Sequence, residues 1–497
     1  MRRLNTIYLS IIVAMAVILV NCRKENLITD SSAKLEFSLD TVLFDTVFTS
    51  IGSTTQLLKV YNRHNKDIQV SRIRIEQGST SQYRINVDGI NGASHTDIII
   101  PENDSIFIFV EVTIDPGGLN LPFIVEDNIV FETNGNEQKV NLVAWGQDAY
   151  FHGGLGNLTV LDPNEEWNND KPHVVYGIVA VDSAECLTIN PGTQVYCHAG
   201  SGIYVYKGCI HVLGELNNEV VFQGDRLEPF YDELAGQWGI EIDFDYETQF
   251  GIETATISRG GLWLYECLPS TINYAVLKNG IVGIQMDTVG NTGGGFGLDI
   301  TNTIVRNMSA VGLWAQGGDI HCENSLVANC GANCTALTIG GRYHFDHCTV
   351  ANYWNESNRQ DATFALTNYY ESIDGDLIVR PVEAIFRNCI LYGNNADLTD
   401  FSEFIIDLEQ EESQNYVFDH CFIDTQENVS DDGLHWFSVA NNPSEPPFID
   451  PFNADFDLPV SVNSTLTAPQ IGGVGEDIEG WTRNSPTALG CYEANNE

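Results

Sequence analysis

The sequence predicts an all-β protein in two parts, a β-sandwich followed by a right-handed, single-stranded parallel β-helix. Residues 35–147 alternate apolar and polar side chains in short runs, which is typical of half-buried strands. An octet of the form FDHCTVAN, at residues 345–352, recurs at 300, 322, 386 and 418, with a weaker copy at 272. At 497 residues, the chain is too long for one compact core, so at least two folding units or one elongated repeat structure are expected.

The first part contains about seven predicted strands, such as LLKVYN, IQVSRIRI and NIVFETN, separated by turns rich in Asn, Gly and Pro. This arrangement is typical of an antiparallel β-sandwich of the immunoglobulin type, which we place over residues 35–148. Its closing VNLVAWG run is similar to that of bacterial Ig-like modules. We find no candidate site in it and interpret it as a spacer or docking module.

The N-terminus has the pattern of an export signal, which we place over residues 1–22, with a linker over 23–34. Arg2 and Arg3 precede an apolar run of fourteen residues, which is too short to span a bilayer as a helix. The following LVNC resembles the lipobox of bacterial lipoproteins, which implies lipidation at Cys22 and an outer-membrane lipoprotein, surface-exposed or periplasmic. The alternative is an ordinary secretory signal.

The charge balance restricts the partners. The chain has 23 Lys and Arg against 68 Asp and Glu, giving a formal net charge of −45. A surface this acidic repels polyanions, so nucleic acid is excluded as a partner. An anionic glycan would need a bridging cation such as Ca²⁺. Neutral glycans and calcium itself stay open, and contact with the membrane is expected only through the lipid anchor.

The octets predict the β-helix, which we place over residues 149–497 with a closing tail after Phe448. Their third residue recurs in steps of 22, 23, 41 and 32 along the chain. A repeat near 22 residues with short strands and polar turns is what one coil requires, and the longer steps are coils with insertions. The third residues are Asn302, Asn324, His347, Asn388 and His420.

The strand period of two predicts which side chains enter the coil. The stacked Cys348, Cys389 and Cys421 should point inward as free buried thiols rather than as metal ligands. Cys186 and Cys209 should instead face outward on neighbouring coils, where Cα atoms lie about 4.8 Å apart. That separation is within disulfide range, so we predict a bridge between them.

The coil pattern I-x-N-C/T-x-V-x-N, with the ending DIEGWTRNSPTALGCYE at 477–493, resembles the parallel β-helix proteins of the pectate-lyase-like superfamily. In particular it is similar to surface lipoproteins of Gram-negative bacteria with an Ig-like front domain. That superfamily includes lyases, hydrolases, epimerases, adhesins and inert scaffolds, so the resemblance implies the fold and not the activity. The catalytic clusters of its pectin-hydrolase-like and polyuronate-lyase members are absent.

One outward-facing patch is the candidate for catalysis or metal binding. The coil register aligns two histidines with several carboxylates, which suits a divalent metal or a general base held by an acid. The alternative is a solvated charge ladder, in which Asp346, Arg387 and Asp419 neutralise one another. The candidate residues are Asp299, His321, Glu323, Arg342, His344 and Asp346.

Two insertions offer a second kind of site. The first carries Tyr353, Trp354, Tyr369, Tyr370 and Arg380, and exposed aromatic rings beside polar groups are what a sugar ring needs for binding. The alternative is that these rings only cover the side of the β-helix. The second insertion, DFSEFIIDLEQEESQNY at 400–416, is strongly acidic and is a candidate for calcium binding or simply a solvated loop.

These patterns favour a cell-envelope lipoprotein that acts as a non-catalytic glycan-binding or adhesion scaffold, with a polysaccharide or cell-surface glycan as its partner. The alternative is a polysaccharide lyase or glycoside hydrolase acting on the outer face of the β-helix. A groove in which the carboxylates and imidazoles of the patch converge would favour the enzyme. A flat or convex face would favour the scaffold.

Overall fold

The computed structural model divides the chain into two compact units, the first ending at Asp148 and the second beginning at Ala149. The predicted signal sequence and Cys22 lie outside the described residues. Within the described part, no helix has the length and apolar character needed to cross a membrane. The described residues are 27–49, 52–115, 123–248, 251–290, 292–372, 375–394, 402–410, 414–441 and 446–494.

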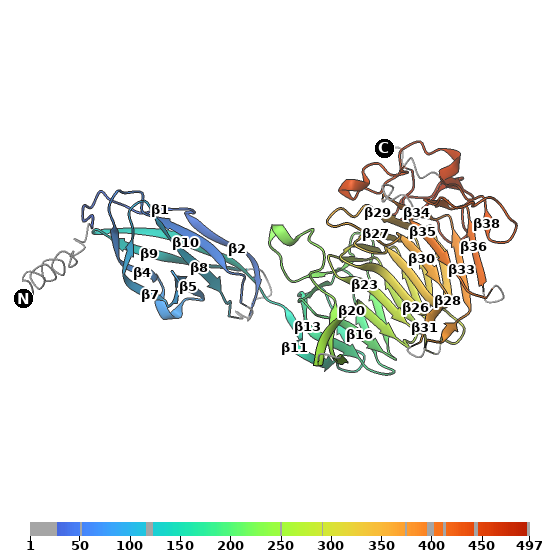
Figure 1. The fold of residues 1–497 in the computed structure, drawn as a ribbon, viewed down its shortest axis with the longest axis horizontal. Helices are drawn as coiled ribbons and strands as arrows, with labels where there is room; N and C mark the ends of the chain where they lie inside the picture. The colour runs from blue at the N-terminus through green and yellow to red at the C-terminus, as the bar shows by residue number, and fades with distance from the viewer. Residues whose placement is uncertain are drawn as a thin grey trace, which may run out of the picture. The chain divides into compact units, whose positions relative to one another are not determined.

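The first unit is an immunoglobulin-like β-sandwich of two five-stranded sheets, as the sequence predicts (Figure 1). One sheet has the order β1-β3-β8-β5-β6 and the other β2-β10-β9-β4-β7. Alternate residues of β8 are buried, because successive side chains of a strand point to opposite faces. The strands are β1 (Glu36–Phe37), β2 (Thr41–Phe48), β3 (Gln56–Tyr61), β4 (Ile68–Ile75), β5 (Tyr83–Val87), β6 (Ile90–Asn91), β7 (Ser94–Ile100), β8 (Ser105–Val112), β9 (Phe123–Thr133) and β10 (Asn136–Gln147).

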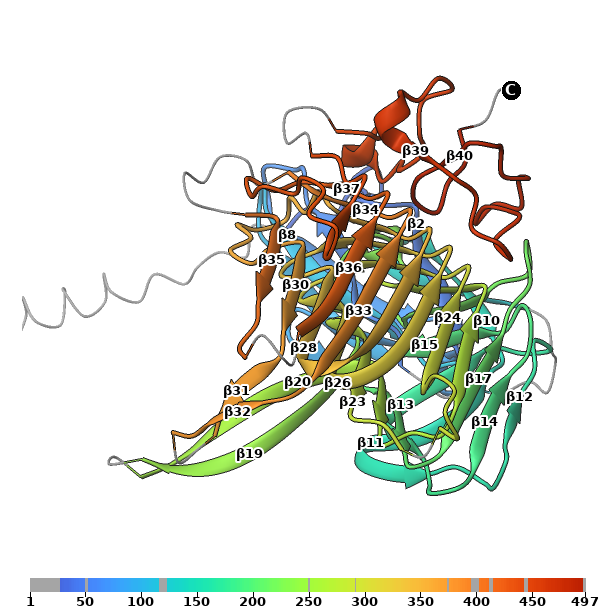
Figure 2. The same ribbon diagram turned by 90° about the vertical axis from the view of Figure 1, so that its right-hand side faces the viewer.

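The second unit is a parallel β-helix with three strands per coil, which confirms the predicted fold class (Figures 1 and 2). Right-handed winding is the rule for parallel strands joined by crossovers. The strands form three sheets along the β-helix, here called A, B and C. Along the chain, each coil passes through sheet A, then sheet B, then sheet C.

Sheet A contains the second half of β13 (His173–Val181), β16 (Gly202–Tyr206), the second half of β20 (Gly251–Tyr265), β23 (Val282–Asp287), the first halves of β26 (Val311–Glu323) and β28 (Thr335–Asp346), β30 (Phe364–Thr367) and β35 (Phe404–Asp407). Sheet B contains β12 (Glu166–Trp167), β14 (Cys186–Ile189), β17 (Cys209–Leu213), β21 (Ser270–Asn273), β24 (Leu298–Thr301), the second halves of β26 and β28, β33 (Val382–Arg387), β36 (Gln414–Asp419) and β38 (Trp436–Phe437).

Sheet C begins with the first half of β11 (Tyr150–Val160) and the first half of β13, while the second half of β11 pairs with the sheet A half of β13. It continues through β15 (Gln194–Cys197), β18 (Val220–Gly224), β22 (Ala275–Lys278), β25 (Ile304–Met308), β27 (Leu326–Cys330), β29 (Thr349–Asn352), β34 (Ile390–Gly393) and β37 (Phe422–Ile423). Two antiparallel hairpins project from the coils, β19 (Ile240–Thr248) with the start of β20, and β31 (Tyr369–Glu371) with β32 (Leu377–Val379) (Figure 2).

The turn between sheets B and C sets the register of the coils. Asn302, Asn324 and His347 occupy it with φ of 48°, 53° and 52°, a left-handed conformation that Asn and His tolerate better than most residues. The Asn324 side chain donates a hydrogen bond to the Oδ1 atom of Asn302 over 2.7 Å. Burial lowers the pKa of His347 to about 3, so this imidazole is a neutral structural group that holds the turn.

The interior is apolar, and the predicted cysteine stack lies within it. Cys348, Cys389 and Cys421 are buried and free. Burial holds the pKa of the Cys348 and Cys421 thiols well above the ordinary value, so they remain protonated and are poor metal ligands. Phe386 stacks at 4.8 Å from Phe345 on the preceding coil, which continues the apolar filling along the axis.

The C-terminal tail closes the β-helix from the side, because it packs on the outer face of sheet C. Phe448, Phe456 and Leu489 of the tail form one apolar cluster with Ile390 and Tyr392 of β34. The tail also contains β39 (Thr467–Ala468) and β40 (Thr487–Ala488). Its buried Arg483 donates a hydrogen bond to the Oδ1 atom of Asn324 over 2.6 Å, which ties the tail to the turn between sheets B and C.

Candidate functional site

The patch predicted from the coil register lies on the outer face of sheet B. Asp299 of β24 pairs in register with His321 of β26, and His321 pairs with His344 of β28. In the row two residues further along each strand, Glu323 pairs with Asp346. The three coils therefore bring the predicted candidates side by side.

Each histidine of the patch has its own carboxylate partner. The Nδ1 atom of His321 lies 3.1 Å from the Oδ1 atom of Asp299, and the Nε2 atom of His344 lies 3.0 Å from the Oε1 atom of Glu383. The hydrogen bond to Asp299 raises the pKa of His321, although burial opposes it. The two imidazoles are thus directed at different acids rather than at one common point.

The arginines of the patch are paired in the same way. Arg342 donates two hydrogen bonds to Asp319, over 2.6 and 2.8 Å. Arg387 donates two hydrogen bonds to Asp346, the first over 2.6 Å. Bidentate pairs of this kind fix both side chains, so Asp346 is committed to a structural ion pair, as the charge-ladder interpretation expects.

A phenylalanine covers the middle of the patch. The Phe296 ring centroid lies 5.4 Å from that of His321 and 5.0 Å from that of His344. The Arg342 guanidinium lies 4.3 Å from the same ring. Phe296 follows Gly293 and Gly294, whose φ of 65° and 97° form a turn that glycine adopts easily. The ring fills the space above the two imidazoles, where an open groove would be needed for a substrate.

Glu323 is the exception in this network. Among the acids of the patch that the structure describes, only its carboxylate has no hydrogen bond or ion pair. Burial raises its pKa and the Asp346 charge adds to this, while His321 opposes it. Glu323 is therefore a half-buried acid available for proton transfer.

The patch does not form a metal centre. One group of three His, Cys, Asp or Glu residues within the described ranges has ligand atoms that all lie within 4.8 Å of one another, and it is Cys186, Cys209 and His211. The patch residues do not converge in this way. The acidic insertion at 400–416 is described only in part, and its Phe404 and Asp407 belong to β35.

The predicted aromatic platform needs correction, because Tyr353 is only 4% exposed. Its ring lies 6.4 Å from Tyr392 and 6.1 Å from Phe448 of the tail, so it belongs to the apolar cluster over sheet C. Trp354 beside it is half-buried and donates its indole hydrogen to Ser357 over 2.9 Å. Tyr353 therefore cannot stack on a sugar.

The other members of that predicted platform lie elsewhere, on and beside the β31–β32 hairpin. Tyr370 is 39% exposed, and Arg380 is exposed directly after β32. Tyr369 donates its hydroxyl hydrogen to Asp407 of β35 over 2.5 Å. The five residues named from the sequence thus divide between two locations rather than forming one surface.

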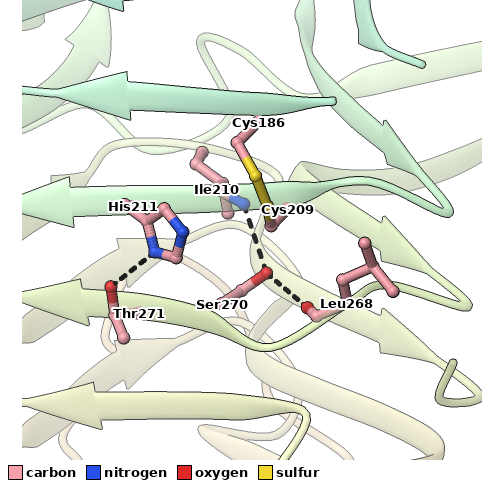
Figure 3. Close-up of a disulfide and its surroundings, with 7 residues drawn as sticks. All are labelled: Cys186, Cys209, Ile210, His211, Leu268, Ser270 and Thr271. Carbon is pink, nitrogen blue, oxygen red and sulfur yellow. Dashed lines mark hydrogen bonds between the residues drawn. A yellow bond between two sulfur atoms is a disulfide. The ribbon is translucent and has the colours of Figure 1, made fainter. Parts of the chain in front are cut away.

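The structure joins the predicted cysteine pair. Cys186 and Cys209 lie opposite each other in the β14–β17 register, with their Cα atoms 4.5 Å apart, and are bonded as a disulfide (Figure 3). The bridge connects neighbouring coils on the outer face of sheet B.

Sheet A carries an aromatic surface that sequence reasoning missed. Its outward-facing positions hold five half-exposed aromatic residues on neighbouring coils, here called the aromatic band. In one row, Tyr204 pairs with Trp263, Trp263 with Gln285, and Gln285 with Trp314. In the next row, Tyr206 pairs with Tyr265, Tyr265 with Asp287, and Asp287 with Gln316. The band consists of Tyr204, Tyr206, Trp263, Tyr265 and Trp314.

Polar side chains fix the middle of the band. Asp287 accepts a hydrogen bond from the indole nitrogen of Trp263 over 2.7 Å and another from Gln285 over 3.0 Å. Gln285 is buried and accepts a hydrogen bond from the Gly260 amide over 2.8 Å. The Trp263 ring is therefore held in one orientation before any ligand arrives.

Trp314 differs from the other rings of the band. The ring centroids of Tyr204 and Trp263 lie 4.5 Å apart, and those of the stacked Tyr206 and Tyr265 lie 5.9 Å apart. In each pair, one ring therefore partly covers the other. Within the described residues, the Trp314 ring has no aromatic partner and its indole makes no hydrogen bond. The next two coils place Ala336 and Ala365 beside it in register. Both neighbours are small, although Ala336 itself is only 5% exposed.

The signal for the band is present in the sequence. The strands read IYVY at 203–206, LWLY at 262–265 and LWAQ at 313–316, with an aromatic residue at the same outward position each time. The octets do not include these strands, and the β19–β20 hairpin interrupts their spacing. A search restricted to the octet period therefore does not align them.

Comparisons with known proteins do not identify a family. No protein-family model matches the chain, and no curated protein matches it. A family 123 glycoside hydrolase from Clostridium perfringens, described for glycolipid glycan hydrolysis, gives a TM-score of 0.17 and 7% identity over 24% of this chain and 30% of the hydrolase. The chain thus spans less than a third of that protein.

Two further solved structures are similarly distant. The ASH/PapD-like domain of human CEP192 gives a TM-score of 0.16 and 9% identity over 23% of this chain and 85% of the domain. Dex49A from Penicillium minioluteum gives a TM-score of 0.17 and 9% identity over 80% of this chain and 82% of that protein. At these TM-scores, the likenesses carry no argument about function.

Proposed function

We propose that this chain is a cell-envelope lipoprotein, anchored through Cys22, whose β-helix binds a neutral glycan without cleaving it. The observation that carries the proposal is the aromatic band of sheet A, with Trp314 and its small neighbours at one end. The LVNC sequence at 19–22 supports the anchor and the export. The net charge of −45 supports a neutral rather than an anionic glycan.

The chemistry of the band suits a sugar chain. A pyranose ring has an apolar face that stacks on an aromatic ring, and hydroxyls that need acceptors and donors nearby. Coils rise by about 4.8 Å, which is close to the length of one sugar unit. A glycan lying along the axis would therefore meet Trp314, then the small side chains of Ala336 and Ala365, with Gln316 and Thr338 in the adjacent row.

Replacing Trp314 with Ala is expected to weaken glycan binding by at least about tenfold, because truncating an aromatic anchor of a binding site costs about 1.4 kcal/mol or more. The measurement is a neutral-glycan array followed by calorimetry with the best oligosaccharide, with and without calcium. Tyr370→Ala is the matched control, since Tyr370 is an exposed aromatic outside the band. Binding that survives Trp314→Ala but is lost in Tyr370→Ala would move the site to the hairpin and reject the band.

A second candidate function is glycan hydrolysis or lysis at the patch on sheet B. Glu323 favours it, because a half-buried acid with a raised pKa is suited to general acid catalysis. Against it, glycoside hydrolysis usually needs a second free carboxylate, while Asp346 is held by Arg387 and Phe296 covers the imidazoles. The binding function therefore has the stronger support.

We expect the wild-type chain to release neither reducing ends nor unsaturated products from the glycan that it binds. We also expect Glu323→Gln to leave the affinity unchanged, because Glu323 lies on sheet B and not in the band. Turnover by the wild type that disappears in both Glu323→Gln and His321→Ala, with unchanged melting temperatures, would replace the binding proposal with the hydrolase or lyase.

A further inference from the structure

Cys186, Cys209 and His211 form a compact group of potential metal ligands on the outer face of sheet B. One sulfur or nitrogen atom from each residue lies within 4.8 Å of the others. Cys209 and His211 are two residues apart on β17, so both side chains point to the same face, and Cys186 lies opposite Cys209 on the previous coil. In the structure the two sulfurs are bonded to each other (Figure 3).

The imidazole of this group is held in an orientation that suits a metal ligand. The Nδ1 atom of His211 lies 3.0 Å from the Thr271 hydroxyl oxygen, and the other ring nitrogen is on the side of the cysteines (Figure 3). When Nδ1 donates its hydrogen to this hydroxyl oxygen, Nε2 has the free electron pair and can bind a cation.

We propose that reduction of the Cys186–Cys209 disulfide opens a site for one thiophilic divalent cation, such as Zn²⁺, held by both sulfurs and His211. A dithiol reductant transfers two electrons and two protons to the disulfide and is itself oxidised to a disulfide, leaving two protein thiols. The cation then displaces the two thiol protons and binds the thiolates. The group can hold a disulfide or a cation, but not both at once.

The geometry agrees with this ligand set. Zinc binds thiolate sulfur at about 2.3 Å and histidine nitrogen at about 2.0–2.1 Å, which places tetrahedral ligands roughly 3.5–3.8 Å apart. Cα atoms 4.5 Å apart allow two sulfurs to separate to that distance by rotation about χ1. Cys186 and His211 are half-buried rather than enclosed, so a reductant, the cation and a water molecule in the fourth position can reach the site.

The other free cysteines do not compete with this group. Those that the structure describes are all buried, and burial raises the pKa of the Cys197 and Cys491 thiols. They lack the outward position that gives Cys186 and His211 contact with solvent. The outer pair therefore differs from the interior stack in both partner and accessibility.

Cobalt titration of the full-length chain tests the proposal. Cys22 is replaced by Ser throughout so that its thiol does not contribute. The protein is reduced with a dithiol, which is then removed under nitrogen, and Co²⁺ is added as a spectroscopic probe for Zn²⁺. We expect one equivalent to bind with sulfur-to-cobalt charge-transfer absorption, no such signal in the oxidised protein, and affinity at least about tenfold weaker in His211→Asn.

Two results would overturn the proposal. One is the absence of charge-transfer absorption in the reduced chain, and the other is a signal that persists in Cys186→Ser/Cys209→Ser or is unaffected by His211→Asn. Should the cysteine variant fail to fold, X-ray absorption of the zinc-loaded, reduced Cys22→Ser protein decides independently. Two sulfur ligands and one imidazole support the site, whereas a shell of oxygen and nitrogen alone rejects it.

Discussion

Replacing Arg359 with Met is expected to lower the free energy of unfolding of the β-helix by about 3–5 kcal/mol, because it leaves a buried carboxylate without its cation. The side chains of Arg359 and Glu403 are only 2% and 5% exposed. They share two hydrogen bonds of 2.7 and 2.6 Å, and the Thr363 hydroxyl donates a third to Glu403 over 2.7 Å. Equilibrium unfolding in denaturant measures the change.

Two controls separate the ion pair from the loss of any arginine. Arg380→Met removes an exposed arginine and should change the free energy of unfolding by less than about 0.5 kcal/mol. Arg359→Met combined with Glu403→Gln should recover much of the loss, since the remaining amide is neutral. A single Arg359→Met variant as stable as Arg380→Met would contradict the role given to this pair.

Asp424 is expected to make the β-helix less stable as the pH rises from about 4 to about 6. This residue is 7% exposed, and burial, with the nearby charge of Glu403, raises its pKa from 3.8 to about 6. The folded state therefore binds more protons than the unfolded state in this window, so stability falls with rising pH and stays lower above pH 6. Asp424→Asn should remove this loss and stabilise the protein above pH 6 by roughly 2–3 kcal/mol.

Asp432 provides a control, because its contribution to stability should change with pH in the opposite direction. Backbone amide hydrogen bonds, that of Trp436 first, lower its pKa to about 2, so its contribution is present above pH 4 and is lost as the pH falls towards 2. Asp432→Asn should reduce stability at neutral pH and have little effect in acid.

Stability curves of Asp424→Asn and wild type that run parallel from pH 4 to pH 7 would show that Asp424 does not titrate in this range.

The coil register could be predicted from the sequence because it is a local property. Each octet contains the end of a sheet B strand, a turn residue with positive φ, and the start of a sheet C strand, as in Ile300, Asn302 and Val305. These requirements recur in every coil, so the residues recur too. The stacking of Cys348 on its neighbours and the approach of Cys186 to Cys209 follow directly from that register.

The surfaces could not be predicted in the same way, because they depend on segments outside the repeat. Tyr353 is buried by Phe448 and Phe456 of the tail, and nothing near Tyr353 in the sequence indicates this. The contact between the His344 and Glu383 side chains could not be predicted, because Glu383 lies on β33. That β33 pairs with β28 depends on which strand follows the insertion. The aromatic band escaped prediction because sheet A strands share a pattern of outward rings but no fixed spacing.

The structure of the chain with the best-binding neutral oligosaccharide tests the central claim most directly. We predict sugar rings on the outer face of sheet A, with one ring stacked on Trp314 and the chain continuing past Ala336 towards Ala365. An oligosaccharide bound instead beside Glu323 on sheet B, or on the first unit, would contradict it.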